Sequence, residues 1–485
     1  MSLPEIKLFN TLSGKKESFK PQSPGKANIY ICGPTVYGLT HVGNARTSLF
    51  GDLVVRTLRY AGFDVQFARN ITDIDDKIIK VASDTGVSSQ DVAKKFTESY
   101  LSEQKQIENL PSDLTPKATE HVTEIVNMSQ GLIDNGSAYV AETPYGQDVY
   151  FRVKNFDGYG KLSKRKTDDL LVGARIEAGE TKEDPLDFAL WKAAKPGEPS
   201  WDSPWGQGRP GWHIECSAMI QKCFPEGLDI HMGGLDLIFP HHENEIAQSE
   251  ALTKKTLAPF WLHGGMLTFA REKMSKSLGN IFTTQKFLDE YGPEVLRLMM
   301  YQNHYRSPLD FTEEVILRTE ALLERLYTAK LKGEESSSQN NDGSPLPELT
   351  TLKADFDAAL FDDFGSAKAL GLVLRGVRSC FKDPRVANWT AWAKITPVLA
   401  QSLGLLSHDA AQSLSEIRSR RLKRMRVTEE FSAQIDAQLK AREEARARKD
   451  FAESDRVRKE LEAQGIQVMD GPDGTAWSMA AKASD

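Results

Sequence analysis

The segment from Asn28 to Ala68 constrains the fold of this chain more than any other stretch. Residues 28–32 have the pattern of a short buried strand, residues 45–60 carry apolar side chains at helical spacing, and residues 65–68 form a second strand-like run. A strand, a helix and a strand in this order begin a doubly wound parallel sheet, whose ligands bind at the carboxyl ends of the strands. The turn at 32–44 is therefore expected to line a crevice.

The 485 residues are enough for two or three hydrophobic cores. We predict an α/β fold in which a Rossmann-type doubly wound parallel sheet occupies residues 1–310. Glycine, proline, tryptophan and short β-like pieces predict an insertion at about 113–225, after which the sheet resumes. Helical spacing predicts a bundle over 311–410 with a flexible loop at 333–347, and 411–485 is a helical and small α/β region.

Composition indicates a soluble protein, with 40% hydrophobic and 27% charged residues. No apolar run reaches the roughly 18 residues that a membrane helix needs, and no export signal is visible. Four scattered cysteines argue against a disulfide framework, so we expect a cytoplasmic protein. The net charge of -7 argues mildly against nucleic-acid binding, although residues 418–426 form a basic block.

Two short motifs indicate nucleotide chemistry. Lys273 and Lys276 lie in the run Lys-Met-Ser-Lys-Ser, where both could reach a triphosphate and follow the charge of a leaving pyrophosphate. In the tetrad from His41 to Asn44, Gly43 lets a ligand approach the backbone while the polar side chains and the helix start donate to phosphate oxygens. A capped helix start would have the same residues, so the tetrad alone is weak evidence.

A third group could hold a metal ion. His241 and Glu245 are four residues apart, so on a helix starting near Pro240 they share a face. Together with the thiolates of Cys32 and Cys216 they would form a plausible tetrahedral zinc set. Spacing alone favours the alternative that two isolated cysteines are small core residues. A zinc protease is disfavoured, because the run His-His-Glu-Asn-Glu lacks the second histidine of such sites.

With these motifs the chain resembles the class I aminoacyl-tRNA synthetases, and more narrowly the cysteinyl-tRNA synthetase family. The narrower resemblance rests on four runs of sequence, at residues 32–37, 70–77, 211–219 and 239–245. It extends from near the amino terminus to about Trp477. It implies that 1–310 is the catalytic domain and that 411–485 binds the anticodon.

The resemblance also implies residue roles. The implied metal ligands, for one Zn2+ per chain, are Cys32, Cys216, His241 and Glu245. The implied catalytic residues are His41, Asn44, Lys273 and Lys276, and ATP would also contact Gly43, Gly233, Gly234 and Asp236. The implied cysteine pocket contains Thr72, Trp212 and His231, and the implied anticodon contacts are Arg446, Asp455 and Asp470. Standing alone, Thr72, Trp212 and His231 would suggest a helix cap, a core tryptophan and a buried histidine.

The expected reaction joins cysteine to the tRNA that carries the cysteine anticodon, through a cysteinyl adenylate, with Mg2+ accompanying ATP. Zinc would select the thiolate of L-cysteine, and the chain is expected to be a monomer that binds no membrane. One alternative is a related ligase that joins cysteine to an amino sugar, which the segment from Arg418 to Trp477 argues against. Another is a noncatalytic RNA-binding relative, which the intact motifs disfavour.

Overall fold

The computed structural model describes residues 3–165, 181–269, 272–273, 282–340, 343–471 and 474–479. The chain divides into two compact units. Unit 1 comprises Met1–Lys105, Asn109–Met266 and Phe361–Asp363, and unit 2 comprises Gln106–Glu108, Leu267–Leu360 and Phe364–Asp485. The domain limits predicted from the sequence, at 310 and 410, stay predictions.

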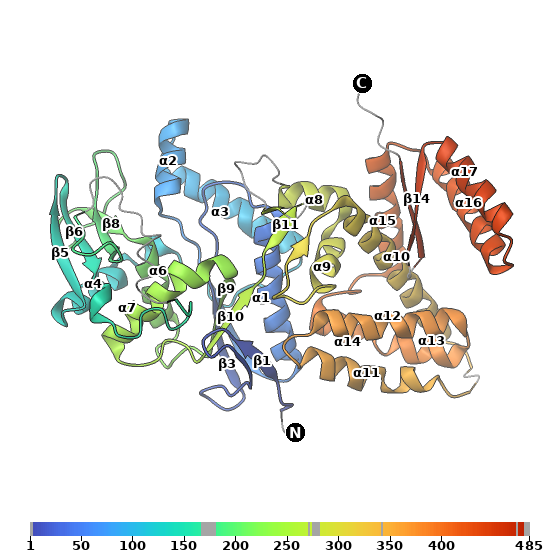
Figure 1. The fold of residues 1–485 in the computed structure, drawn as a ribbon, viewed down its shortest axis with the longest axis horizontal. Coiled ribbons are helices and arrows are strands. Elements are labelled where there is room, and N and C mark those ends of the chain that lie inside the picture. The colour runs from blue at the N-terminus through green and yellow to red at the C-terminus, as the bar shows by residue number, and fades with distance from the viewer. Residues whose placement is uncertain are drawn as a thin grey trace. The chain divides into compact units, whose positions relative to one another are not determined.

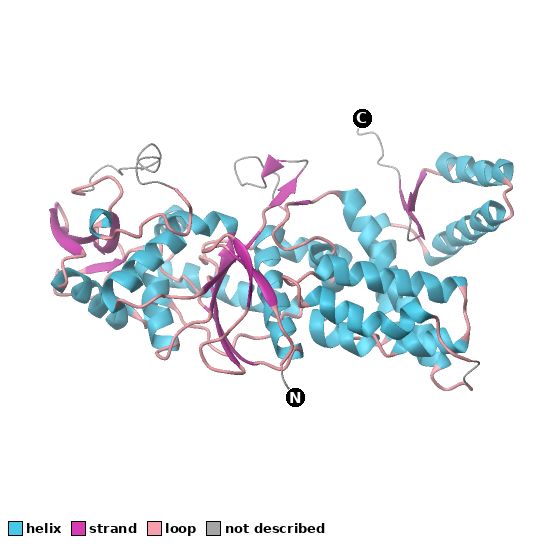
Figure 2. Cartoon of the chain, turned by 60° about the horizontal axis from the view of Figure 1, so that its bottom comes forward, coloured by secondary structure: helices cyan, strands magenta, loops and turns pink. Residues whose placement is uncertain are grey.

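A four-stranded parallel sheet forms the centre of unit 1 (Figure 2). Its order is β10 (Phe260–Gly264), β9 (Ile230–Gly234), β3 (Lys26–Ile31) and β4 (Asp64–Arg69), and every neighbouring pair is parallel. Helix α1 (Val42–Tyr60) connects β3 to β4. Strands β9 and β10 are buried throughout, whereas β3 and β4 begin with the exposed residues Lys26 and Asp64. The parallel order of the four strands confirms the predicted Rossmann-type sheet.

Unit 1 also contains the predicted insertion, which is a second, antiparallel sheet (Figure 1). Its strands are β5 (Ala138–Thr143), β6 (Gly146–Phe151), β7 (Phe188–Ala193) and β8 (Gly208–Pro210), in that order. One face packs on α4 (Val122–Asp134), and the stacked rings of Phe151 and Phe188 lie in the shared core.

Further elements of unit 1 precede, link or follow the strands of these sheets. They are β1 (Lys7–Asn10), β2 (Lys15–Ser18), α2 (Asp76–Thr85), α3 (Ser89–Gln106), α6 (Trp212–Cys223), the 3-10 turn η3 (Leu235–Leu237), the π-turn η4 (Ile238–His242) and α7 (Glu243–Thr253). Three of them, α6, η4 and α7, carry three of the four candidate metal ligands described below.

Unit 2 is mainly helical, as its apolar spacing predicted. Its elements are β11 (Leu267–Phe269), β12 (Glu272–Lys273), α8 (Thr284–Tyr291), α9 (Pro293–Tyr301), β13 (Leu309–Asp310), α10 (Glu313–Ser336), α11 (Pro347–Leu360), α12 (Ser366–Lys382), α13 (Val386–Ala393), α14 (Thr396–Leu403), α15 (Ala410–Met425), α16 (Glu429–Ala447), α17 (Phe451–Ala463), β14 (Ile466–Gly471) and β15 (Gly474–Met479). Helix α10 continues to Ser336, so the first residues of the segment predicted as a loop at 333–347 are helical.

The end of unit 2 forms a small α/β unit with its own hydrophobic core. The antiparallel hairpin β14–β15 lies beside α16 and α17 (Figure 2), and their apolar side chains form one core that includes Ile435, Leu461 and Trp477. None of the helices that the structure describes is both long and apolar enough to cross a membrane.

Candidate metal centre and active site

Four elements of unit 1 each contribute one side chain to a buried cluster. Cys32 directly follows β3, Cys216 lies in the middle of α6, His241 in the turn η4, and Glu245 in the first turn of α7. All four side chains are buried, and Glu245 has no exposed surface. The structure thus brings together the four predicted ligands, although the chain separates the two cysteines by 184 residues.

The geometry of this cluster fits a tetrahedral metal site. The sulfur atoms of Cys32 and Cys216 lie 3.8 Å apart. Two thiolates at about 2.3 Å from a zinc ion and at the tetrahedral angle would be separated by about 3.8 Å. Glu245 Oε1 lies 3.5 Å from Cys32 Sγ and 2.9 Å from His241 Nε2, and all four ligand atoms lie within 4.8 Å of one another.

A second set of four ligand atoms overlaps the first. His231 and His242 can replace Cys216 and His241 around Cys32 and Glu245, again with every ligand atom within 4.8 Å. The distance from His242 Nε2 to Cys32 Sγ is 3.3 Å, whereas His242 Nδ1 lies 2.8 Å from a third histidine, His263. Only the first set offers two sulfur ligands, which Zn2+ prefers over a single one in closed sites.

The electrostatics of the cluster favour a cation. Burial raises the pKa of the Cys32 thiol well above its ordinary value. The pKa of Cys216 falls to about 6, because Cys32 donates a hydrogen bond to its sulfur. Burial would raise the pKa of Glu245 too, but His231 and His241 hold it well below the ordinary range. Cys216 and Glu245 are therefore the anionic members of this buried cluster; against the effect of burial they raise the pKa of His241 to about 10, and a bound metal ion would take the place of its proton in balancing their charge.

Two of the three side chains predicted to form the cysteine pocket contact this cluster. Trp212 begins α6, and its ring stacks on His241 with centroids 4.3 Å apart. His231 is fully buried and its Nε2 lies 2.7 Å from Glu245 Oε2, while its ring stacks on Trp261. His231 therefore contacts a predicted ligand directly, a relation that the sequence did not reveal.

Taken alone, the sequence around Thr72 suggests a helix cap. In the structure, Thr72 does not cap a helix. The cap of α2 is Asp75, whose side chain accepts a hydrogen bond from Lys77 N–H. Thr72 is buried, its backbone pairs with Thr35 across a parallel bridge, and its hydroxyl accepts a hydrogen bond from Asn70. The segment after β4 thus lies beside the segment after β3, which carries Cys32.

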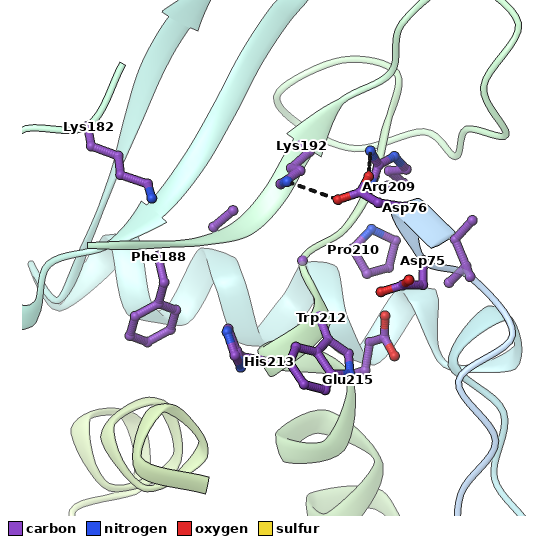
Figure 3. Close-up of a pocket in the computed structure, with 13 residues that line it drawn as sticks. Asp75, Asp76, Lys182, Phe188, Lys192, Arg209, Pro210, Trp212, His213 and Glu215 are labelled. Carbon is purple, nitrogen blue, oxygen red and sulfur yellow. Dashed lines mark hydrogen bonds and ion pairs between the residues drawn. The ribbon is translucent and has the colours of Figure 1, made fainter. Parts of the chain in front are cut away.

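Trp212 also lines a pocket of about 250 Å³ (Figure 3). Its lining includes Trp212, His213 and Glu215 from α6, and an ion-paired group in which Asp76 contacts Arg209 and Lys192. Sequence reasoning missed His213, whose Nδ1 lies 3.1 Å from His241 Nδ1. A ring nitrogen that faces the second nitrogen of a ligand histidine fixes the orientation of that ligand. The sequence signal that could have identified His213 is its position within one helical turn of Trp212 and Cys216.

The tetrad at the start of α1 forms a capping box. His41 Nδ1 accepts a hydrogen bond from the backbone of Asn44, and the Asn44 side chain accepts one from the backbone of His41. Gly43 is required by this arrangement, because a Cβ there would lie 2.9 Å from the His41 ring. The capped helix start considered as the alternative reading is therefore present, and it holds both side chains at the amino end of α1.

The glycines that end β9 have a steric role as well. A Cβ on Gly233 would lie 2.7 Å from the ring of His242, and one on Gly234 would lie 2.5 Å from Asp236 Oδ1. These glycines therefore make room for His242, a member of the second ligand set, and for the following turn, in which Asp236 lies. Their predicted contact with ATP stays a prediction.

The lysine motif is described only at its start. Lys273 ends β12, whose backbone pairs with β11. Lys276 and the rest of this motif lie outside the described residues.

The predicted anticodon contacts all lie in the small α/β unit at the end of unit 2. Arg446 extends from α16, Asp455 from α17, and Asp470 from β14. Asp455 is exposed, whereas Asp470 is already engaged by Arg446 at 3.0 Å and by the buried Arg442.

Comparisons with known proteins agree with the order of these units. Residues 18–321 match the family described as "tRNA synthetases class I (C) catalytic domain", and residues 428–477 match the "Cysteinyl-tRNA ligase anticodon binding domain". The chain is 47% identical to the cysteine--tRNA ligase of Nitratidesulfovibrio vulgaris strain Hildenborough, over 98% of this chain and 100% of that protein. It is 44% identical to the cysteine--tRNA ligase of Thermodesulfovibrio yellowstonii, over 98% of this chain and 99% of that protein.

Solved structures support the fold. The methionyl-tRNA synthetase of Mycobacterium tuberculosis in complex with methionyl-adenylate superposes with a TM-score of 0.59 at 15% identity, over 81% of this chain and 93% of that one. A LeuRS from Agrobacterium radiobacter superposes with a TM-score of 0.60 at 10% identity, over 82% of this chain and 86% of that one. At these identities the likeness establishes the shared fold alone. With near full-length identity of 47% to a cysteine--tRNA ligase and both family matches in order, the chain belongs to the cysteinyl-tRNA synthetase family of class I aminoacyl-tRNA synthetases.

Proposed function

We propose that Cys32, Cys216, His241 and Glu245 hold a zinc ion that selects cysteine for ligation to its tRNA. As a member of its family, the chain is a cysteine--tRNA ligase: it uses ATP to activate cysteine and transfers the cysteinyl group to the tRNA. The single observation that carries the zinc assignment is the buried convergence of two sulfurs, an imidazole and a carboxylate within 4.8 Å.

The metal explains how the enzyme could distinguish cysteine from serine. When bound, zinc supplies a soft Lewis acid that favours a thiolate over a hydroxyl group of similar size. Trp212 and Thr72 would enclose the amino acid beside it, and His231 would keep Glu245 in the orientation that the metal requires. A site built around one required polar contact can reject the analogue that lacks it by roughly 10⁴-fold.

The ATP site is proposed at the amino end of α1. The capping box holds His41 and Asn44 at this helix start, where helix N–H groups favour phosphate oxygens. Lys273 and Lys276 would neutralise the charge that develops on pyrophosphate, together with Mg2+ that accompanies ATP. Gly233, Gly234 and Asp236 would contact the adenosine.

The carboxylate of cysteine attacks the α-phosphate in line, and pyrophosphate leaves. The terminal ribose hydroxyl of the tRNA then attacks the cysteinyl adenylate and releases AMP. Neither step needs a covalent bond to a side chain, so catalysis consists of positioning and charge stabilisation. We further propose that Arg446, Asp455 and Asp470 contribute to reading the anticodon, which the match of residues 428–477 supports.

Replacement of Cys216 by serine tests the metal assignment. The variant should lose most of its zinc and its cysteine-dependent ATP–pyrophosphate exchange together, since a hydroxyl is a poor zinc ligand. The matched control is Cys223→Ser, because Cys223 lies in the same helix, is partly exposed and belongs to neither ligand set. Full zinc content in the Cys216 variant would refute the assignment.

The two overlapping ligand sets can be separated in the same way. His241→Asn should release zinc, whereas His242→Asn should retain near-stoichiometric zinc, if the first set is the correct one. The opposite result would assign the metal to His231 and His242 instead.

A further inference from the structure

A buried arginine lies beside the proposed anticodon-reading residues. The Arg442 side chain, on α16, has only 4% of its surface exposed. Such a guanidinium needs a partner, because an unpaired buried charge is costly. It is paired with Asp470: the two terminal nitrogens of Arg442 donate to the two carboxylate oxygens, at 2.9 and 2.6 Å. This forked geometry is the most directional pairing of an arginine with a carboxylate.

Asp470 is the centre of a larger group of contacts. Besides both bonds from Arg442, it receives an ion pair from Arg446 at 3.0 Å and a hydrogen bond from the Thr475 hydroxyl at 3.1 Å. Hydrogen bonds from Arg442 lower the pKa of Asp470 to about 2. An ionised carboxylate offers about four acceptor positions, and the hydrogen bonds from Arg442 and Thr475 occupy three of them.

Arg446 has the opposite character. It lies one helical turn after Arg442 on α16, so both side chains share a face, but 48% of the Arg446 side chain is exposed. A guanidinium has five N–H donors, and the ion pair with Asp470 uses only part of this capacity. The remaining donors are suited to a guanine edge or a phosphate.

We infer that Arg442 is a positioning residue for anticodon reading: it fixes Asp470, and Asp470 fixes the exposed guanidinium of Arg446 that contacts the tRNA. This inference rests on the proposed anticodon-reading role of the region. It adds a positioning role to Asp470, which the sequence resemblance made a direct contact.

The test uses Arg442→Met in the full chain. Methionine keeps an unbranched apolar stem, and Asp470 remains solvated because 35% of its side chain is exposed. We expect the KM for tRNA to rise roughly 10-fold, as for the loss of a hydrogen bond to a charged group, with cysteine-dependent ATP–pyrophosphate exchange unchanged. Arg458→Met is the matched control, because Arg458 lies in the same small unit in an exposed pair with Glu462 and should leave the KM unchanged.

A double variant separates positioning from a general structural role. If Arg442 acts through Arg446, the Arg442→Met/Arg446→Met variant should have the same KM for tRNA as Arg446→Met alone. The inference would be overturned if the fold-increase in KM of the double variant equals the product of the fold-increases of the two single variants. An unchanged KM in either single variant would overturn it as well. Hydrogen exchange of α16 and β14 reports whether the unit stays folded, and if Arg442→Met unfolds it, Arg442→Lys replaces it in the same cycle.

The same assays separate failure of this inference from failure of the proposed function. Absence of cysteine-dependent exchange in the wild-type chain would refute the proposed reaction. Equal charging of tRNAs with the cysteine anticodon and with a substituted anticodon would refute anticodon reading, and with it the role of Arg442. Normal wild-type behaviour combined with additive variants would overturn the positioning role alone.

Discussion

Replacement of His231 by phenylalanine tests whether this residue orients a metal ligand or contacts cysteine. The His231 Nε2 atom lies 2.7 Å from Glu245 Oε2, and its ring stacks on Trp261 with centroids 4.5 Å apart. Phenylalanine preserves an aromatic ring at this position and removes the hydrogen bond. The other ring nitrogen of His231, Nδ1, is buried and has no hydrogen-bond partner among the described residues. Removing Nδ1 therefore leaves no other group without a hydrogen bond.

The expected effect follows from the nature of the lost contact. A hydrogen bond to a charged group contributes about 1.5–3 kcal/mol, which corresponds to roughly 10- to 100-fold in an equilibrium constant. Loss of a group that orients a metal ligand changes metal affinity by a similar factor. We therefore expect His231→Phe to bind zinc roughly 10- to 100-fold more weakly than the wild-type chain.

Competition with a chromogenic zinc chelator measures this affinity directly. At saturating zinc, the variant should recover cysteine-dependent exchange with a nearly normal KM for cysteine. His121→Phe serves as the control, because His121 contacts a backbone carbonyl at the start of α4, outside both ligand sets. Unchanged zinc affinity with a raised KM for cysteine would refute the positioning role and assign His231 to the amino-acid pocket.

Three further outcomes are expected. Gly43→Ala should raise the KM for ATP roughly 10-fold in pyrophosphate exchange, because the added Cβ would lie 2.9 Å from the His41 ring. The control is Gly371→Ala, which should leave this KM unchanged because a Cβ there has no atom within 4 Å. An equal KM for ATP in the two variants would contradict this prediction. Lys276→Met should lower kcat for exchange by roughly 10²-fold with little change in the KM for ATP, as expected for charge stabilised in the transition state; a change in KM alone would argue against it. Burial lowers the pKa of His263 to about 3, below its value of about 6.5 in the unfolded chain, so its contribution to stability is complete above pH 6.5 and is lost as the pH falls toward 3. The protection of β9 and β10 in hydrogen exchange should therefore fall by up to roughly tenfold per pH unit below 6.5, and less steeply in His263→Gln; equal slopes would be inconsistent with that pKa.

The elements of the parallel sheet were predictable because their signals are local. A run of apolar residues identifies β3, and apolar spacing identifies α1, so the βαβ order and the crevice followed from short windows of sequence. The start of α1 was placed three residues late, at 45 rather than at Val42, because the capping box has a histidine at the N-cap in place of serine or threonine and an asparagine at N3 in place of glutamate or glutamine.

The metal cluster was less accessible to sequence reasoning. Cys32 and Cys216 come from different elements, so neither periodicity nor spacing indicated that their sulfurs lie 3.8 Å apart. Family resemblance supplied that pairing. Choosing His241 over its neighbour His242 also required the resemblance, and the structure brings both rings close to Glu245.

Contacts that depend on tertiary packing were not predictable at all. Arg442 belongs to none of the sequence motifs, although its side chain is buried against Asp470. Similarly, Gly233 was attributed to nucleotide binding, and nothing in its neighbours indicated that it leaves space for the ring of His242.

The most direct test of the account is the discrimination between cysteine and serine with and without zinc. ATP–pyrophosphate exchange is measured with each amino acid on the zinc-loaded chain and on the same chain after the metal is removed. The account predicts a preference for cysteine of roughly 10⁴-fold or more in kcat/KM, which collapses on removal of zinc and returns when zinc is added. A preference for cysteine that persists in the zinc-free chain would contradict it.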